Sequence, residues 1–539
     1  MNTPSSATKS NSLSRSSRSP GPGLFVLADG KDMRITFFLV ASLFLLWGLC
    51  NGMIDTMDKH FQDQLHLTKA QSAWVQFAHY MGYTLMALPA GLLTRRIGYK
   101  GGIIAGLLLV SVGGFWFIPA TRISQFWAFL FGVCLIAMGL TVLETVANPY
   151  TTLLGPRERG PTRINLAQSF NGIGWILGPI IGGAYFYSEG GVEVAHGQLY
   201  IPYMGVGIIV LVLAALFFFA YVPDIKSEDI YRTDEGQMAD ESAGHAGKEY
   251  NRVAIFILMV LNVAALGFAI YMILNLILPA CGVGPDIAKW IVPTAAILPV
   301  VASAILLIPI SRNITHHNIW AHPHFSSATL TQFLYVAAQA GIFSFFINYI
   351  ISEMPSIAKT TVDGWLIHGN AVLRESAYYV NEKGATRLLG YGGFALFCLG
   401  RFVGSALINR APAHRVLGCY AIVNAVLCGI VVLKLGWISV AAVFLTFFFM
   451  SVMFPTIFAL GIHGLGPQSK KKAAAFIVMS ITGGALMPKL MGHLGDIYNM
   501  SISFWMPLVC FALIAAYGLS WSKLSQEQGV RGLKGAGGH

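Results

Sequence analysis

Charged side chains are scarce in this sequence: Asp, Glu, Lys and Arg together make up 11% of its 539 residues, while 55% are hydrophobic. A soluble protein needs about a quarter of its residues charged to cover its surface. Apolar runs of about 20 residues recur along the chain, and each is long enough to cross a hydrocarbon core of roughly 30 Å. The composition excludes a soluble globular protein and predicts an all-α integral membrane protein.

Chemical signatures of several other classes are also missing. The seven cysteines include no C-x-x-C pair, which argues against a disulfide framework or a thiolate metal site. No Walker motif follows a strand, so ATP-driven transport is disfavoured. No nucleophile–base pair or metal-ligand set is evident, so we expect no enzyme activity, cofactor or metal. The net charge of +11 is assigned to cytoplasmic loops rather than to nucleic-acid binding.

Hydropathy predicts about fourteen spanning helices, with boundaries that are soft by a few residues. They lie near 35–55, 71–93, 101–119, 126–154, 161–188, 200–222, 253–279, 289–311, 326–352, 386–409, 416–435, 437–463, 471–492 and 500–522. The expected domains are a disordered cytoplasmic tail (1–34), a six-helix bundle (35–222), a cytoplasmic loop (223–252), an extra helix pair with its linker (253–325), a second six-helix bundle (326–522) and a cytoplasmic tail (523–539).

An internal sequence repeat relates the two bundles. The Gly, Pro and Gly of one segment recur with the same spacing and a constant displacement in a second segment: Gly174, Pro179 and Gly183 match Gly483, Pro488 and Gly492. Two six-helix halves in parallel repeat form the major facilitator plan, in which substrate binds near mid-membrane between the halves. The helix pair near 253–311 falls outside the repeat, and we expect it at the periphery.

Basic residues set the expected orientation. With both termini in the cytoplasm, the inside segments carry most of the Lys and Arg, namely Arg95, Arg96, Lys100, Arg157, Arg159, Arg163, Arg410, Arg415 and Lys470 to Lys472. The loop 353–385 is then external.

The stretch 141–179 holds the most informative polar residues. Glu144 lies in an apolar run, where a carboxylate must face the protein interior or a water-filled path. On the following helix Gln168 is three residues from both Asn165 and Asn171, so the amides share one face. Removal from water favours the neutral form of an acid, which lets it take up and release a proton near neutral pH. The pattern indicates a polar, uncharged substrate and a proton; the alternative is that these groups only bond helix to helix.

Several ordered motifs resemble those of the fucose/galactose/glucose:proton symporter family of the major facilitator superfamily. They are LETVANPYTTLLGP (143–156), RINLAQSFN (163–171), WGLCNGMID (47–55), GRFVGSALINRAPAHRVLGCYA (400–421) and FPTIFALGIHGLG (454–466). The resemblance covers most of both halves and is absent over 1–34 and roughly 223–325. It implies a monosaccharide carrier driven by a proton gradient and working by alternating access.

The resemblance also assigns roles. It implies that Glu144 and Asp55 couple proton movement and that Gln168 and Asn171 face the sugar, with Asn51 beside Asp55. Asp55 is expected near the end of the first helix, next to Asp58 and partly hydrated.

Further polar residues are weaker candidates for a sugar path. Gln76 shares a helix face with His79 and Tyr83, and Gln339 and Asn348 place amides on the first helix of the second half. Carriers of fucose tend to have arginine at the position of Asn348, so asparagine is closer to the glucose/galactose branch. Arg401 is expected to brace helices, and Lys489 has no assigned role.

We therefore expect a proton-coupled monosaccharide symporter, monomeric in the bilayer of an inner or plasma membrane. Two alternatives stay open. An isolated carboxylate does not distinguish proton from sodium coupling without its surrounding oxygen ligands. A transport-inactive sugar sensor on the same scaffold would keep the amides and could dispense with Glu144.

Overall fold

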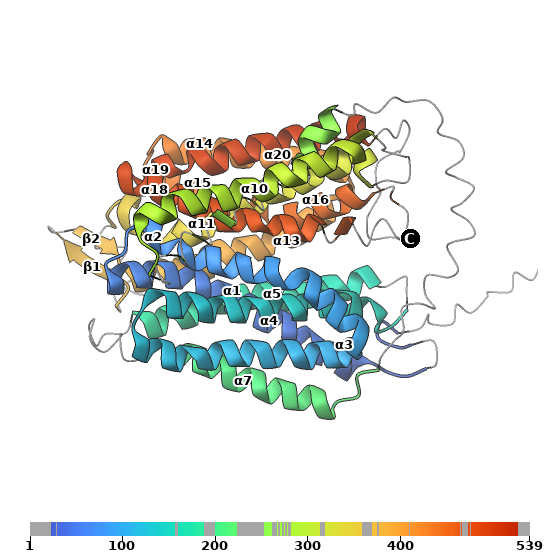
Figure 1. Cartoon of the computed structure of the whole chain (residues 1–539). Coiled ribbons are helices and arrows are strands. Elements are labelled where there is room, and N and C mark those ends of the chain that lie inside the picture. Colours follow the sequence, from blue (N-terminus) through green and yellow to red (C-terminus); the bar gives the residue numbers. More distant parts are fainter. Residues whose placement is uncertain are drawn as a thin grey trace, which may run out of the picture.

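The computed structural model is a helical bundle (Figure 1). It describes residues 23–27, 30–156, 160–187, 200–223, 253–260, 282–312, 319–357, 369–374, 377–408, 410–463, 465, 473–474 and 476–525, with isolated positions between 263 and 278. Among the described residues, ten helices are long and apolar enough to cross a membrane. The expected loop at 223–252, apart from Pro223, the linker 313–318 and most of both tails lie outside the described residues.

The N-terminal half forms the lower layer of Figure 1, coloured blue to green. Its helices are α1 (Arg34–Leu65), α2 (Lys69–Ser72), α3 (Trp74–Ile123), α4 (Phe126–Leu153), α5 (Gly160–Phe186) and α7 (Tyr200–Phe219).

Two predicted spans are joined without a loop in α3. Gly98 has a φ of 75° and a ψ of −179°, outside helical geometry, and this conformation is open essentially only to glycine. The chain folds back there, because Gly82 before the joint and Gly113 after it both pack against residues 134–138 of α4. The expected helices at 71–93 and 101–119 are the two arms of this hairpin.

The C-terminal half forms the upper layer, coloured yellow to red (Figure 1). It comprises α11 (Pro323–Glu353), α12 (Glu382–Leu388), the π-helix η5 (Leu389–Phe394), α13 (Ala395–Ile408), α14 (Ala413–Val432), α15 (Trp437–Met450), α16 (Met453–Ile462), η6 (Ser480–Thr482), α18 (Gly483–Ile497), α19 (Met500–Ser503) and α20 (Trp505–Leu524), preceded by the short η3 (Ile319–Ala321). A two-stranded antiparallel hairpin, β1 (Ala371–Arg374) and β2 (Ala377–Val380), adds a small element that hydropathy did not predict. We call the end of the bundle that carries this hairpin the hairpin end.

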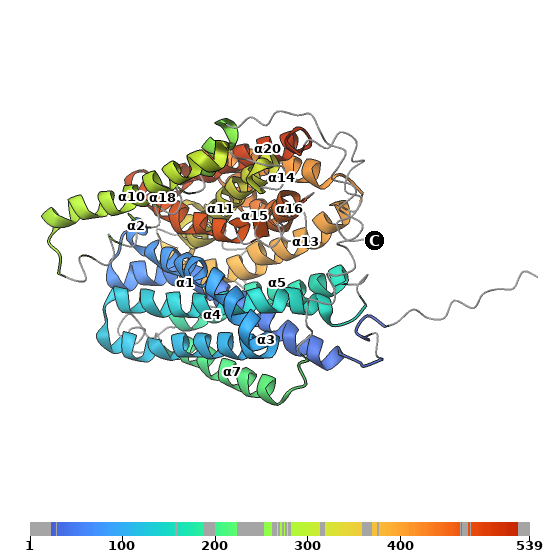
Figure 2. The same ribbon diagram turned by 45° about the vertical axis from the view of Figure 1, so that its right-hand side comes forward.

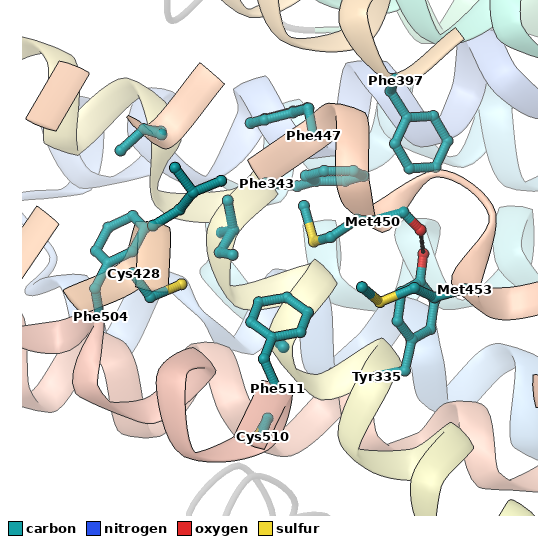
Figure 3. Packing of buried hydrophobic residues seen from close by; sticks show 14 of the residues in the cluster. Tyr335, Phe343, Phe397, Cys428, Phe447, Met450, Met453, Phe504, Cys510 and Phe511 are labelled. Atoms are coloured by element: carbon teal, nitrogen blue, oxygen red, sulfur yellow. Dashed lines mark hydrogen bonds between the residues drawn. The ribbon is translucent and has the colours of Figure 1, made fainter. Parts of the chain in front are cut away.

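Each half has its own hydrophobic core, since the buried apolar residues fall into one large cluster per half. Figure 3 shows the C-terminal core, where Phe343 and Phe447 stack with ring centroids 4.7 Å apart. In the same view the Tyr335 hydroxyl donates to the Met450 carbonyl over 3.0 Å.

That hydrogen bond lies at a break in a predicted helix. The sequence predicts one helix over 437–463, but α15 ends at Met450 and α16 begins at Met453. Pro455 has no N–H to donate to the carbonyl four residues earlier, that of Ser451. Tyr335 and Arg401 take the freed carbonyls instead: Arg401 Nε donates to Ser451 over 3.4 Å.

The predicted extra pair is described mainly by α10 (Pro285–Arg312). Only 12% of its spanning window is buried, and Trp290 and Leu306 are 73% and 66% exposed. α10 is drawn across the C-terminal half in Figure 1, and in Figure 2 one end of it projects beyond the rest of the bundle. As expected, its faces suit contact with lipid.

At the end opposite the hairpin, Arg163 has a role that charge counting did not predict. Its side chain is fully buried, and it donates to the carbonyls of Thr151, Leu24, Pro156 and Gly155 over 3.0 to 3.2 Å. These include orphan carbonyls where α4 ends. Arg163 therefore caps a helix and fastens the segment before α1, in addition to contributing positive charge.

Candidate functional site

The amides of α5 meet as the helical spacing predicts. Asn171 Nδ2 donates to Gln168 Oε1 over 2.9 Å, and Gln168 Nε2 lies 3.5 Å from Asn148 Oδ1 on α4. Asn171 is buried, and its Oδ1 has no hydrogen-bond partner among the residues that the structure describes. Gln168 is half-buried. The accessible part of the Gln168 amide is available to a hydroxylated ligand, whereas Asn171, whose Oδ1 lies against Gly48 of α1, orients Gln168 from within the packing.

Glycines hold this helix against α1. Gly48 and Gly52 face Gly174 and Gly178, two G-x-x-x-G pairs, so the backbones approach closely. A Cβ at Gly174 would lie 2.2 Å from the Leu45 carbonyl oxygen, and one at Gly178 would lie 2.7 Å from the Gly52 Cα. The crossing fixes where Asn171 sits relative to α1.

Glu144 reaches a small recess beside Gln168. The recess is also lined by Trp47, Leu43 and Phe44 of α1. Glu144 is half-buried, and its carboxylate has no hydrogen-bond or ion-pair partner among the described residues. The Trp47 indole donates to the Tyr83 hydroxyl, which orients one ring at the recess. An acid, an amide and an aromatic ring thus meet where the two sequence motifs cross.

Arg401 joins this site from the other half, a contact that its sequence context alone does not reveal. Its Nη1 donates to Gln168 Oε1 over 3.2 Å, and its guanidinium lies 4.9 Å from the centroid of Phe397. Gln168 Oε1 therefore accepts from both Asn171 and Arg401. The bracing role predicted for Arg401 is confirmed, but the helix it braces is the one that carries the candidate sugar-binding amides.

A second polar cluster lies nearer the hairpin end. Gln76 Nε2 donates to Asp55 Oδ1 over 2.9 Å and lies 3.3 Å from Asp58 Oδ2. Both carboxyl groups are buried. The expectation of a partly hydrated Asp55 at a helix end is wrong, because α1 continues ten residues further to Leu65. The 35–55 window ended where apolar residues become less frequent, although the helix goes on inside the protein.

The remaining predicted site residues make their hydrogen bonds and ring contacts outside the Gln168 cluster. Asn51 donates to the Trp47 carbonyl of its own helix over 2.7 Å. Asn348 is bonded to Gln62 of α1, and Gln339 is half-buried on α11. His79 is buried on α3 with its ring against Tyr83. Neither Gln339 nor Asn348 is hydrogen-bonded to the Gln168 cluster.

Lys489, left without a role by the sequence, contacts the opposite half. Its ammonium lies 4.4 Å from the centroid of the Trp74 ring, a cation–π contact between α18 and α3. In the part of the chain that the structure describes, no group of three or more His, Cys, Asp or Glu is arranged to hold a metal ion.

The profile of the Major Facilitator Superfamily matches residues 36–364. The chain belongs to the Major Facilitator Superfamily. Its two halves, each with a separate core, agree with the fold that this family implies, including the predicted parallel repeat.

Relatives of this facilitator cover nearly its whole length. The L-fucose-proton symporter of Escherichia coli (strain K12) is 30% identical over 89% of this chain and 91% of its own. A glucose/galactose transporter of Brucella abortus biovar 1 (strain 9-941) is 27% identical over 89% and 92%. The crystal structure of an alanine variant of the E. coli fucose:proton symporter matches with a TM-score of 0.56 and 29% identity, covering 91% of this chain and all of that one. The resemblance inferred from the motifs is confirmed.

Proposed function

We propose that this facilitator is a proton-coupled monosaccharide symporter of an inner or plasma membrane that works by alternating access as a monomer. The observation that carries the proposal is the meeting of Glu144, Gln168 and Trp47 at one recess. The names of the relatives, a fucose-proton symporter and a glucose/galactose transporter, support a hexose-type substrate.

The geometry supports a division of labour within the site. Amide groups exchange hydrogen bonds with sugar hydroxyls without adding charge, and the indole of Trp47 offers a flat apolar face to the C–H side of the ring. Among the described residues Glu144 has no hydrogen-bond or ion-pair partner that would fix its charge, so its carboxyl group takes up a coupled proton at the sugar site, with Asp55 as the second coupling acid.

A bound sugar competes with Arg401 for Gln168 Oε1, and the hydrogen bond between these two residues links the halves. Gln168 Oε1 already accepts two hydrogen bonds, one of them from Arg401. A sugar hydroxyl that replaces Arg401 on this oxygen loosens one direct contact between α5 and α13. Binding energy is then available to shift the relative position of the halves, as population shift requires.

In this conformation the hairpin end is closed. The Asp496 carboxylate accepts from the backbone N–H groups of Lys69 and Ala70 over 3.0 and 2.9 Å, and Thr84 and Thr482 share a hydrogen bond of 3.0 Å. With both termini cytoplasmic, as the basic residues favour, this is the external end of the transport path.

Reporter fusions test that orientation. A reporter placed within 223–252 should be cytoplasmic, and one placed within 353–385 should be external, because α11 separates the two segments after an even-numbered extra pair. Reports from the same compartment would contradict the helix count on which the topology depends.

Gln168→Ala and Asn171→Ala should each weaken sugar binding several-fold, because a lost hydrogen bond of this kind costs about 0.5–1.5 kcal/mol. Affinity is measured on purified protein by calorimetry or by ligand-dependent tryptophan fluorescence. Asn424→Ala is the matched control, since Asn424 is a buried amide on α14 in the core of the other half. Parental affinity in both α5 variants would return these amides to a helix-packing role.

An uptake assay in energised vesicles tests the proposal as a whole. A panel of labelled hexoses identifies the sugar, and an uncoupler should abolish its accumulation. Uptake that requires sodium and resists the uncoupler would favour sodium coupling, and sugar binding without any uptake would favour the sensor.

A further inference from the structure

We propose that Asp58, together with Asp55, forms a second proton-binding site whose proton holds the hairpin end of the bundle closed. The inference rests on the proposed proton-coupled transport. To Asp55, for which the resemblance already implies a part in proton movement, it adds Asp58, which neither the sequence motifs nor the Glu144 site uses.

The two carboxyl groups are held around one nitrogen. Gln76 Nε2 lies 2.9 Å from Asp55 Oδ1 and 3.3 Å from Asp58 Oδ2, so these oxygens are at most 6.2 Å apart. The other oxygens, Asp55 Oδ2 and Asp58 Oδ1, are buried and have no hydrogen-bond partner in the part of the chain that the structure describes. Asp55 is 4% exposed and Asp58 is fully buried.

No cation compensates this pair among the described residues. Electrostatic contacts link the pair to Tyr80 of α3, Tyr187 after α5 and Tyr203 of α7. The neighbouring helices also carry Lys59 and His60 (α1), Lys69 (α2), His79 (α3) and Glu144 (α4), while α11 presents the uncharged Ser344 and Asn348. Lys59 pairs with Asp63 and Lys69 pairs with Asp496. Two like charges this close and out of water disfavour each other, so the pair is stable only with at least one proton bound.

Asp58 also touches the other half. Ser344 of α11 donates to Asp58 Oδ2. One helical turn further, Asn348 Nδ2 donates to Gln62 Oε1 over 2.6 Å. Both contacts join α1 to α11 across the same step of 286 residues, so they form two successive rungs between the first helices of the halves.

Proton loss acts directly on these rungs. A neutral Asp58 fits a dry interface between α1 and α11. An ionised pair requires water, and water enters only if the two helices separate. The bound proton therefore favours closure, and its release favours opening, which is the coupling that an external proton must provide before a loaded carrier can turn inward.

The test measures the width of the hairpin end in the absence of sugar. Spin labels are placed at Gln125→Cys and Leu435→Cys, two exposed positions at that end of the two halves, in a chain whose native cysteines are replaced and which still transports. Pulsed electron–electron double resonance then measures the distance between the two labels in nanodiscs, and the distance distribution gives the open fraction at each pH. In the parent the open fraction should rise severalfold as the pH rises.

Asp58→Asn keeps the size of the side chain and its bond to Ser344 but has no proton to lose, so the hairpin end should stay closed at every pH. Asp32→Asn is the control and should keep the parental response, because Asp32 is an exposed carboxylate that pairs with Arg34 at the opposite end of α1. Because no sugar is used, failure of this inference is distinguishable from failure of the Glu144 mechanism. An open fraction that follows the parental curve in Asp58→Asn, or that ignores pH in the parent, overturns the proposal.

Ser344→Ala supplies an independent variant if Asp58→Asn does not fold. It removes one rung and leaves both acids, so the open fraction should increase at low pH while the response to pH persists. A closed fraction at low pH equal to that of the parent would also overturn the proposal.

Discussion

Vesicles that contain Glu144→Gln should exchange labelled sugar at close to the parental rate but should not accumulate it against a gradient. Glutamine keeps the size of the acid and most of its hydrogen bonding, but it takes up no proton in this pH range. The variant can bind sugar and carry it in both directions, while the return of the empty carrier is no longer linked to proton release. Counterflow and proton-driven accumulation are measured in the same preparation.

Glu353→Gln provides the matched control for this experiment. Glu353 is the last residue of α11 and pairs with Lys434 over 3.1 Å at the hairpin end, away from the recess. It should accumulate sugar like the parent. If Glu144→Gln also does so, Glu144 is not the coupling acid and the proposed mechanism is wrong.

The second large effect, a loss of stability, is expected from the single methyl group that alanine adds at Gly174. Gly174→Ala should destabilise the protein by about 1–3 kcal/mol or more, the usual cost of overpacking. Its Cβ would lie 2.2 Å from the Leu45 carbonyl oxygen, 2.7 Å from the Leu49 nitrogen and 2.9 Å from the Gly48 Cα. All three are backbone atoms, so relief requires α1 and α5 to move apart.

The loss of stability is measured as a lower melting temperature. The purified protein is heated, and size-exclusion chromatography gives the fraction that stays folded at each temperature. Gly205→Ala on α7 is the control, because a Cβ there meets nothing within 4 Å. Its melting temperature should equal or slightly exceed that of the parent, since alanine is the better helix former. Equal melting temperatures for the two variants would show that the glycine crossing does not limit stability.

Sequence patterns predicted most helices because each needs only a local apolar run. The expected helix 126–154 is α4 (Phe126–Leu153), and 161–188 is α5 (Gly160–Phe186). Hydropathy windows measure length, however, and they do not register a change at one residue. They therefore missed the joint at Gly98 and the break before Pro455, where a single backbone group changes the path of the chain.

In the candidate site, too, local contacts could be predicted and contacts between distant residues could not. The spacing of Gln168 and Asn171 predicted their contact, because residues three apart on a helix are neighbours. The contacts of Gln168 with Arg401 and of Asp58 with Ser344 join residues 233 and 286 positions apart. Only the packing of the two halves brings these residues together. The sequence therefore showed Asp58 beside Asp55 but not its contact with Ser344.

The break between α15 and α16 also explains how an arginine is kept within the bundle without an acid. The guanidinium of Arg401 donates to the carbonyl of Ser451, the C-cap of α15, where the aligned peptide dipoles leave a partial negative charge. Among the described residues no carboxylate pairs with it. Both partners belong to the C-terminal half, so the positive charge and its compensation travel together when the halves rock. The carbonyl dipole stabilises this arginine without cancelling its unit charge, so the membrane potential acts on the C-terminal half through Arg401 in every step in which that half moves across the field.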